Sequence, residues 1–266
     1  MSYNTILFDI EDGIARLTLN RPKVYNSLSP LMLDELLDVM TKINPDDGIK
    51  VLLVNAAGKG FCAGADLASA DLDFEGDQPV GEQVYRNMEE RFNPMLKAIQ
   101  NIPVPTVAAI DGVVAGGGVG LALMFDIVIA TPRSKFSLVF LPQLGIIPDM
   151  GVSWHLPHKL GMARAMGYAC LGESISGQDA AQMGMIWKCI EEDQFESGIN
   201  DILKRLSMGP TRAFPRARQA FDAAIRNSLP EHLGYEAETQ RELCNSPEFK
   251  EGVQAFQQRR KPDFSR

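Results

Sequence analysis

The sequence contains few of the residues that build disulfide frameworks and metal sites. Only four cysteines and three histidines occur among its 266 residues. The cysteines, Cys62, Cys170, Cys189 and Cys244, have no paired spacing. Zinc sites need closely paired cysteines or histidines, and regular cysteine frameworks are typical of small secreted domains. We therefore interpret the four thiols as reduced, and we predict no metal site.

An excess of basic charge and long apolar runs are also absent. The net charge is −8 and the pI is about 5.0, so no basic face attracts nucleic acid or anionic lipid. Charged residues or prolines interrupt each apolar run before it reaches the length of a membrane span. The first residues, Met1–Asn4, lack the basic start and the apolar core of a signal peptide. We expect a cytoplasmic protein with no membrane or nucleic-acid partner.

Apolar residues are abundant and periodic. They make up 45% of the chain, enough for one large core. Strands alternate with helices between Thr5 and Ile147, which predicts an α/β protein. A helix with one apolar stripe is predicted over Pro30–Lys42, a mobile acidic loop over Ala70–Gln83, and a final helix over Pro247–Gln258 in a region that is helical from Met162 onward. The predicted strands are Ile6–Phe8, Ile14–Leu19, Val51–Val54, Thr106–Ile110 and Ile127–Ala130.

Glycines are concentrated in the run Asp111–Gly120, which follows a predicted strand. A strand that ends in glycines and opens onto a helix presents free N–H groups, which suit a phosphate or an oxyanion that exists only during a reaction. The phosphate-loop pattern G-x-x-x-x-G-K-[ST] and the dinucleotide pattern G-x-G-x-x-G are both missing. The remaining alternative is that the glycines only let a helix pack closely against a sheet.

A second turn of the same kind follows the predicted strand Val51–Val54. The residues after it, Ala56–Leu67, are small and then polar, which is typical of a tight turn before a helix. If the two turns met, one N–H from each would form a two-donor hole for the oxygen of an enolate or a thioester.

These motifs occur in an order that resembles the crotonase (enoyl-CoA hydratase/isomerase) superfamily from end to end. The resemblance implies a spiral of β-β-α turns with a helical C-terminal region. It divides the chain into an acyl-CoA-binding core at residues 1–200 and a trimerisation region at 201–266, and implies a homotrimer or a dimer of trimers. The matching segments are Leu19–Ser27, Phe61–Leu67, Asp111–Asp126, Leu144–Pro148 and Phe249–Phe264.

The resemblance also implies a substrate and its contacts. An acyl-CoA thioester would place its carbonyl oxygen between the backbone N–H groups of Ala65 and Gly117, and no cofactor beyond the coenzyme A of the substrate is implied. For Arg259 a solvated basic tail remains an equal alternative, and for Asp66 a helix cap. The positions that match coenzyme A contacts are Lys23, Val24, Tyr25, Ala63, Asp66, Leu67, Phe256 and Arg259.

The chain departs from the hydratases at their two catalytic glutamates. The matching positions hold Gly120 and Leu141, which cannot transfer a proton. Asp149 stands where enoyl-CoA isomerases carry a single catalytic carboxylate, and the segment Gly161–Trp187 resembles the epoxyphenylacetyl-CoA isomerases of phenylacetate degradation. The expected activity is therefore that of an acyl-CoA isomerase, with a hydratase or a non-catalytic binding protein as alternatives. Asp149 as a helix N-cap is the structural alternative, and for Asp126 we expect a structural role.

Overall fold

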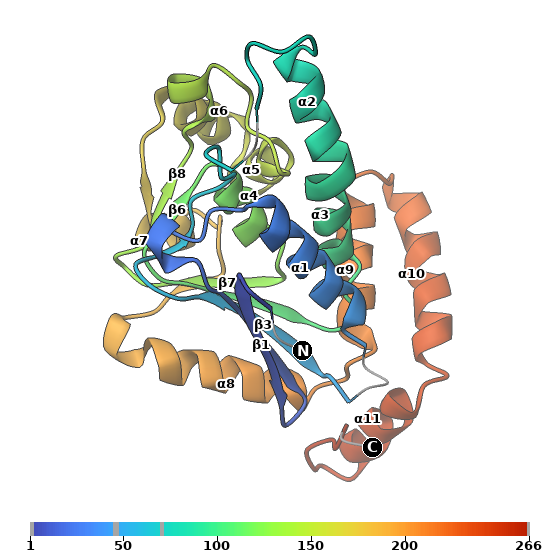
Figure 1. Ribbon diagram of the computed structural model, residues 1–266. Coiled ribbons are helices and arrows are strands. Elements are labelled where there is room, and N and C mark those ends of the chain that lie inside the picture. The colour runs from blue at the N-terminus through green and yellow to red at the C-terminus, as the bar shows by residue number, and fades with distance from the viewer. Residues whose placement is uncertain (1–2, 45–47, 70–71, 265–266) are drawn as a thin grey trace.

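The computed structural model describes residues 3–44, 48–69 and 72–264. Two β-sheets form its centre, and helices cover both faces of the larger one (Figure 1). The larger sheet has the order β1 (Ile6–Glu11), β2 (Ile14–Leu19), β3 (Val51–Ala56), β5 (Thr106–Ile110), β7 (Ile127–Ala130) and β10 (Lys188–Cys189). The smaller sheet has the order β4 (Gly60–Cys62), β6 (Val113–Ala115), β8 (Lys135–Ser137) and β9 (Ile175–Ser176).

The chain builds these sheets in successive turns of a spiral. Each turn adds one strand to the larger sheet and the next strand to the smaller one, as β3 and β4, β5 and β6, then β7 and β8. Strands from successive turns pair in parallel in both sheets. The expected β-β-α spiral is confirmed, and so are the strands predicted in the first half. The helices within the spiral are α1 (Pro30–Lys42), α2 (Val80–Asn87), α3 (Asn93–Gln100), α4 (Gly117–Leu123), α5 (Val152–Leu160), α6 (Met162–Leu171) and α7 (Gly177–Gln182).

Helix α1 has the predicted bounds because local and tertiary preferences agree there. Ser29 is its N-cap and accepts a hydrogen bond from the Met32 N–H, and Pro30 occupies the first helical position, where no N–H is needed. Its apolar stripe is buried in the main core, which includes Leu36 and Val39. The helix therefore begins where capping predicts and buries the face that periodicity predicts.

The predicted loop Ala70–Gln83 is too long at its C-terminal end. Residues 70–71 lie outside the described residues, and helix α2 already begins at Val80. The Gln83 side chain explains the early start, since its amide nitrogen donates to the carbonyls of Asp73 and Gln78 and ties the helix to the preceding loop. The region after Met162 also contains the short strands β9 and β10, where only helices were expected.

Helix α8 (Phe195–Ser207) crosses the second face of the larger sheet, on the side away from α1 and α3 (Figure 1). Its Ile199 and Leu203 form a second core with apolar residues of β3, β5 and β7. The predicted division at residues 200 and 201 therefore falls inside a helix that packs on the spiral. The helices beyond it are α9 (Ala213–Ala224), α10 (Leu229–Leu243) and α11 (Pro247–Gln257), of which α9 and α10 bury no residue fully.

Candidate active site

The two glycine-containing turns meet in the structure. One turn follows β4 and contains Gly64, and the other joins β6 to α4 and contains Gly117. A Cβ atom added to Gly64 would lie 2.9 Å from the Gly117 nitrogen and 2.9 Å from the Ala115 carbonyl oxygen. Gly64 also has a φ of +89°, a conformation that glycine adopts readily. Glycine is therefore required here both for its conformation and for the close approach of the turns.

Each turn leaves one backbone N–H group available. In the first turn the amides around Ala65 have acceptors, namely Tyr25 O for Ala63, Cys62 Sγ for Gly64 and Leu28 O for Asp66. Within the described part of the chain, the Ala65 N–H has no such acceptor. The Gly117 N–H begins α4, where a helix has no internal partner for its first amides. Two donors on adjoining turns remain free, which is what an oxyanion hole requires.

The segment that contains Arg21 holds the first turn in place. The Arg21 guanidinium forms an ion pair with Asp66 at 2.8 Å, in which both side chains are largely buried. Arg21 also donates to the Ser27 carbonyl, and the Asn26 side chain donates to the Gly60 carbonyl. Desolvation raises the pKa of Asp66, but hydrogen bonds from Arg21 and Ser69 outweigh it and leave that pKa below its ordinary value. Asp66 is thus an ion-pair partner and does not cap a helix.

Asp149 lies beside the second turn. Its Oδ1 is 3.8 Å from the position of a Cβ on Gly117, so the carboxylate lies beside this glycine. Burial raises the pKa of Asp149 above its ordinary value, and a hydrogen bond from its own backbone N–H opposes this only in part. No other hydrogen bond or ion pair involves this carboxylate within the described residues. A carboxylate with these properties is a stronger base than an exposed aspartate.

The alternative role of Asp149 as an N-cap is wrong. Helix α5 has Gly151 as its N-cap residue, with φ +81°, and no side chain caps that helix. Asp149 contributes only its backbone carbonyl, which accepts the Val152 N–H at 2.9 Å. Its carboxylate is therefore not engaged in helix capping.

The two positions that match the hydratase glutamates differ in what surrounds them. A Cβ on Gly120 would lie 2.2 Å from the Met150 carbonyl oxygen, so backbone already occupies the space of a side chain there. Leu141 lies in a π-helical turn, Phe140–Leu144, and 38% of it is exposed. Neither position supplies a proton-transfer group, and at Gly120 the fold leaves no room for one.

The predicted coenzyme A contacts fall into two groups. The first group contains an exposed turn formed by Lys23, Val24 and Tyr25. It lies beside the turn that follows β4, where the Tyr25 carbonyl accepts a hydrogen bond from the Ala63 N–H. Leu67 is 57% exposed and is the next residue after Asp66, the ion-pair partner of Arg21. This first group adjoins the Ala65 turn.

The second group, Phe256 and Arg259, lies elsewhere. Phe256 is in α11 and is 85% exposed. Figure 1 shows α11 at the lower right, well away from α4 and α5. A single chain does not bring these two residues to the site, so their role stays a prediction that needs a neighbouring chain.

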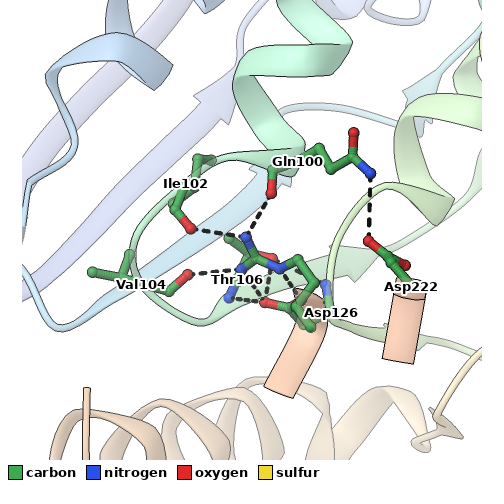
Figure 2. A network of polar contacts seen from close by, with 7 residues as sticks. Gln100, Ile102, Val104, Thr106, Asp126 and Asp222 are labelled. Carbon is green, nitrogen blue, oxygen red and sulfur yellow. Dashed lines mark hydrogen bonds and ion pairs between the residues drawn. The ribbon is translucent and has the colours of Figure 1, made fainter. Parts of the chain in front are cut away.

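Asp126 has the structural role expected of it. Both of its carboxylate oxygens accept hydrogen bonds from the Arg218 guanidinium at 2.6 Å, and one also accepts from the Thr106 backbone and hydroxyl (Figure 2). Arg218 donates further to the backbone carbonyls of Gln100, Ile102 and Val104. This cluster fastens α9 to the loop before β5.

Sequence reasoning missed Arg218 and Met150. Arg218 is one of two arginines in α9, and nothing in its spacing indicates that it is 12% exposed and fully hydrogen-bonded. Met150 lies between Asp149 and Gly151 with φ +49°, a conformation that a methionine gives no reason to expect. The signal that could have drawn notice is its place directly after the candidate base.

Two cavities lie on helix α9 and are not lined by Asp149, Ala65 or Gly117. One, of about 960 Å³, is bounded by α9, α10 and α11, and the other, of about 740 Å³, lies between α9 and the helices α3 and α5. In the second, burial lowers the pKa of His155 to about 4, so this histidine is neutral and packs against Met124. Neither cavity therefore belongs to the candidate site, which is defined by the free N–H groups of Ala65 and Gly117 and by Asp149.

Among the described residues, no helix is long and apolar enough to cross a bilayer.

Comparison with known proteins places the chain in one family. The family model for enoyl-CoA hydratase/isomerase matches residues 9–266. A probable enoyl-CoA hydratase of Rhodobacter capsulatus is 38% identical over 265 residues, with 100% of this chain and 99% of the relative covered. The 1,2-epoxyphenylacetyl-CoA isomerase of Escherichia coli is 38% identical over 260 residues, covering 98% of both proteins.

A solved structure agrees with the sequence comparison. The crystal structure of an enoyl-CoA hydratase/isomerase assigned by similarity in Mycobacterium abscessus superposes with a TM-score of 0.89 at 32% identity, over 97% of this chain and 98% of that one. The fold is the crotonase fold, and enzymes of this family act on acyl-CoA thioesters. The chain therefore belongs to the enoyl-CoA hydratase/isomerase family.

Proposed function

We propose that this enzyme is an acyl-CoA isomerase that uses Asp149 as its single acid and base. The observation that carries the proposal is the carboxylate of Asp149 beside Gly117, with a raised pKa and no other partner within the described residues. Water addition with two glutamates has no counterpart here, because Gly120 and Leu141 take their places.

The proposed reaction needs one base and one oxyanion hole. The Asp149 carboxylate removes the α proton of a 3-enoyl thioester, and the electron pair of that C–H bond delocalises into an enolate. The N–H groups of Ala65 and Gly117 donate to the enolate oxygen. Asp149 then returns the proton to the γ carbon, and the product is the conjugated 2-enoyl thioester. Losing one such donor costs about 2.7–4 kcal/mol in barrier height.

The proposal includes contacts for coenzyme A and an assembly. The exposed residues beside the Ala65 turn hold the cofactor part of the substrate, and no other cofactor is required. Phe256 and Arg259 serve only if α11 of a second copy approaches the site, which the proposed homotrimer or dimer of trimers provides. The proposed contacts from the same chain are Lys23, Val24, Tyr25, Ala63, Asp66 and Leu67.

Rearrangement of a ring epoxide is the second candidate reaction. It is favoured by the 38% identity to the isomerase of Escherichia coli that is named for 1,2-epoxyphenylacetyl-CoA. Both candidates require an oxyanion hole, and the acyl group decides between them. Phenylacetate degradation is the metabolic setting that the second candidate implies.

A panel of coenzyme A esters tests the proposal. The purified enzyme is given 3-enoyl, 2-enoyl and ring-epoxide esters, and products are followed by ultraviolet absorbance and mass. We expect conjugation of 3-enoyl esters without a change in mass, and uptake of solvent deuterium at carbon in deuterium oxide. Faster addition of water to 2-enoyl esters would establish the hydratase alternative, and tight binding without turnover of any ester would establish the non-catalytic one.

A further inference from the structure

Met150 has an unusual backbone conformation for its residue type. Its φ is +49°, and the following Gly151 has a φ of +81°, so two left-handed residues separate Asp149 from helix α5. Met150 is also buried, with 5% of it exposed. Left-handed conformations are unfavourable for a long side chain and persist where the surrounding packing imposes them.

Two glycines of α4 supply that packing. A Cβ on Gly120 would lie 2.2 Å from the Met150 carbonyl oxygen and 2.9 Å from the Met150 Cβ. One helical turn earlier, a Cβ on Gly117 would lie 2.3 Å from the Met150 Sδ. The backbone of Met150 thus occupies the space that a side chain at position 120 would fill. Its thioether packs against Gly117, the glycine whose N–H is free.

We propose that Met150 is a positioning residue, seated on Gly120 and Gly117, that aims the Asp149 carboxylate at the oxyanion hole. This inference rests on the proposed function, because it assigns Met150 a role through Asp149. Met150 directly follows Asp149 in the chain, and its backbone and thioether both contact α4. A shift of about 1 Å at a catalytic group can cost about a hundredfold in rate, so this contact affects activity directly.

The same contact makes Gly120 a specificity-determining position. An acid at position 120 would occupy the space of the Met150 carbonyl, so it would displace the segment that carries Asp149. An acid at position 120 and the present position of Asp149 are therefore incompatible in this backbone.

The alternative is that Met150 only fills space between α4 and α5. Under that alternative a disturbance would lower stability and substrate binding together with turnover. A positioning role predicts instead that kcat falls while affinity for a saturated acyl-CoA stays unchanged, because the proposed coenzyme A contacts of this chain are other residues than Met150 and Gly120.

Gly120→Ala and Met150→Gly test the inference, with Gly167→Ala as the matched control. Gly167 is also a helical glycine, in α6, but a Cβ there meets nothing within 4 Å. Measurements are kcat on a 3-enoyl-CoA, the Kd of a saturated acyl-CoA by calorimetry, and thermal unfolding. We expect kcat about a hundredfold lower in Gly120→Ala, with Kd unchanged. Met150→Gly should lower kcat in the same direction, and the double variant should show far less than the summed effect.

The outcomes separate this inference from the proposed function. Asp149→Asn with wild-type turnover overturns the proposed function itself. An inactive Asp149→Asn together with a Gly120→Ala as active as Gly167→Ala overturns only the positioning role, and so does an equal loss of turnover and acyl-CoA binding. If Gly120→Ala does not fold, Met150→Gly decides, since wild-type kcat in that variant contradicts the role and a reduced kcat with unchanged Kd supports it.

Discussion

Two aspartates of this chain show how surroundings decide what a carboxylate does. Asp126 accepts hydrogen bonds from Arg218 and Thr106, so donors of the protein occupy both of its oxygens. Burial raises the pKa of Asp149, whose carboxylate has only its own backbone N–H as a donor among the described residues. A buried carboxylate with satisfied oxygens stabilises structure, whereas one without partners retains its capacity to take a proton.

The two regions around these aspartates also differ in how they are built. Around Asp126, the Arg218 guanidinium of α9 donates to the carboxylate and to carbonyls at the end of α3 and in the loop before β5 (Figure 2). Beside Asp149, Met150 packs on the glycines of α4, Gly117 and Gly120, which have no side chains. Hydrogen bonds and charge fasten the first region, whereas close packing against glycines holds the second and leaves the Asp149 carboxylate without a donor from another residue among the described residues.

Replacing Asp149 should have the largest effect on activity. Asp149→Asn keeps the shape of the side chain but removes the proposed proton acceptor, so the rate of the proposed isomerisation should fall by roughly two to four orders of magnitude. Steady-state kinetics on 3-enoyl-CoA measures this, with acyl-CoA binding by calorimetry expected to be retained. Asp126→Asn is the control, since it should lower thermal stability and leave the chemistry of the folded enzyme intact. Equal rate losses in both variants would contradict the comparison.

Obstructing the proposed oxyanion hole should have the next largest effect. In Gly117→Val, the valine Cβ would lie 2.3 Å from the present position of the Met150 Sδ. The added side chain should also cover the free N–H of residue 117. Turnover should fall about a hundredfold to a thousandfold, the usual cost of losing one oxyanion donor. Kinetics of this variant beside Gly167→Ala provides the measurement. A wild-type rate in Gly117→Val would mean that the hole lies elsewhere.

Breaking the Asp126 cluster should affect stability more than catalysis. Arg218→Ala leaves Asp126 and several carbonyls without donors, and the free energy of unfolding should drop by about 2–4 kcal/mol, somewhat below the cost for a fully buried pair. Arg216→Ala is the matched control in the same helix. Its ion pair with Glu242 is largely exposed and should contribute about 0.2–1 kcal/mol. Chemical denaturation of both variants gives the two free energies of unfolding. Similar losses would show that the Asp126–Arg218 cluster contributes no more to stability than an exposed ion pair.

The pH dependence should show the smallest effect and separates activity from stability. Asp149 must be ionised to act as a base, so kcat/KM should rise with pH, with a midpoint above the ordinary range of an aspartate because its pKa is raised. Stability should respond in the opposite sense. The folded form holds this proton more tightly than the unfolded form, so the contribution of Asp149 is present below the unfolded pKa and is lost as pH rises through the folded pKa. Asp149→Asn should remove both trends. Identical pH profiles of stability in wild type and variant would contradict the raised pKa.

Much of the spiral could be predicted because its signals are local. The alternation of apolar runs and turns predicted every strand of the larger sheet except β10, and Ser29 followed by Pro30 fits the start of the helix predicted over Pro30–Lys42. Gly117 and Asp149 were also proposed from sequence, since a glycine-rich turn and a carboxylate in a family position can be recognised without coordinates. Each of these features depends on residues that are neighbours in the chain.

The sequence by itself determined the family, five strands of the larger sheet and the types of residue available for chemistry. The tertiary structure alone decided that the Gly64 and Gly117 turns touch, that Met150 adopts a left-handed conformation on Gly120, and that Arg218 saturates Asp126. It also decided that α11 lies away from the site within one chain. The physical reason is that backbone clearance, hydrogen-bond saturation and the direction of a C-terminal helix depend on contacts between segments far apart in sequence, which local propensity does not encode.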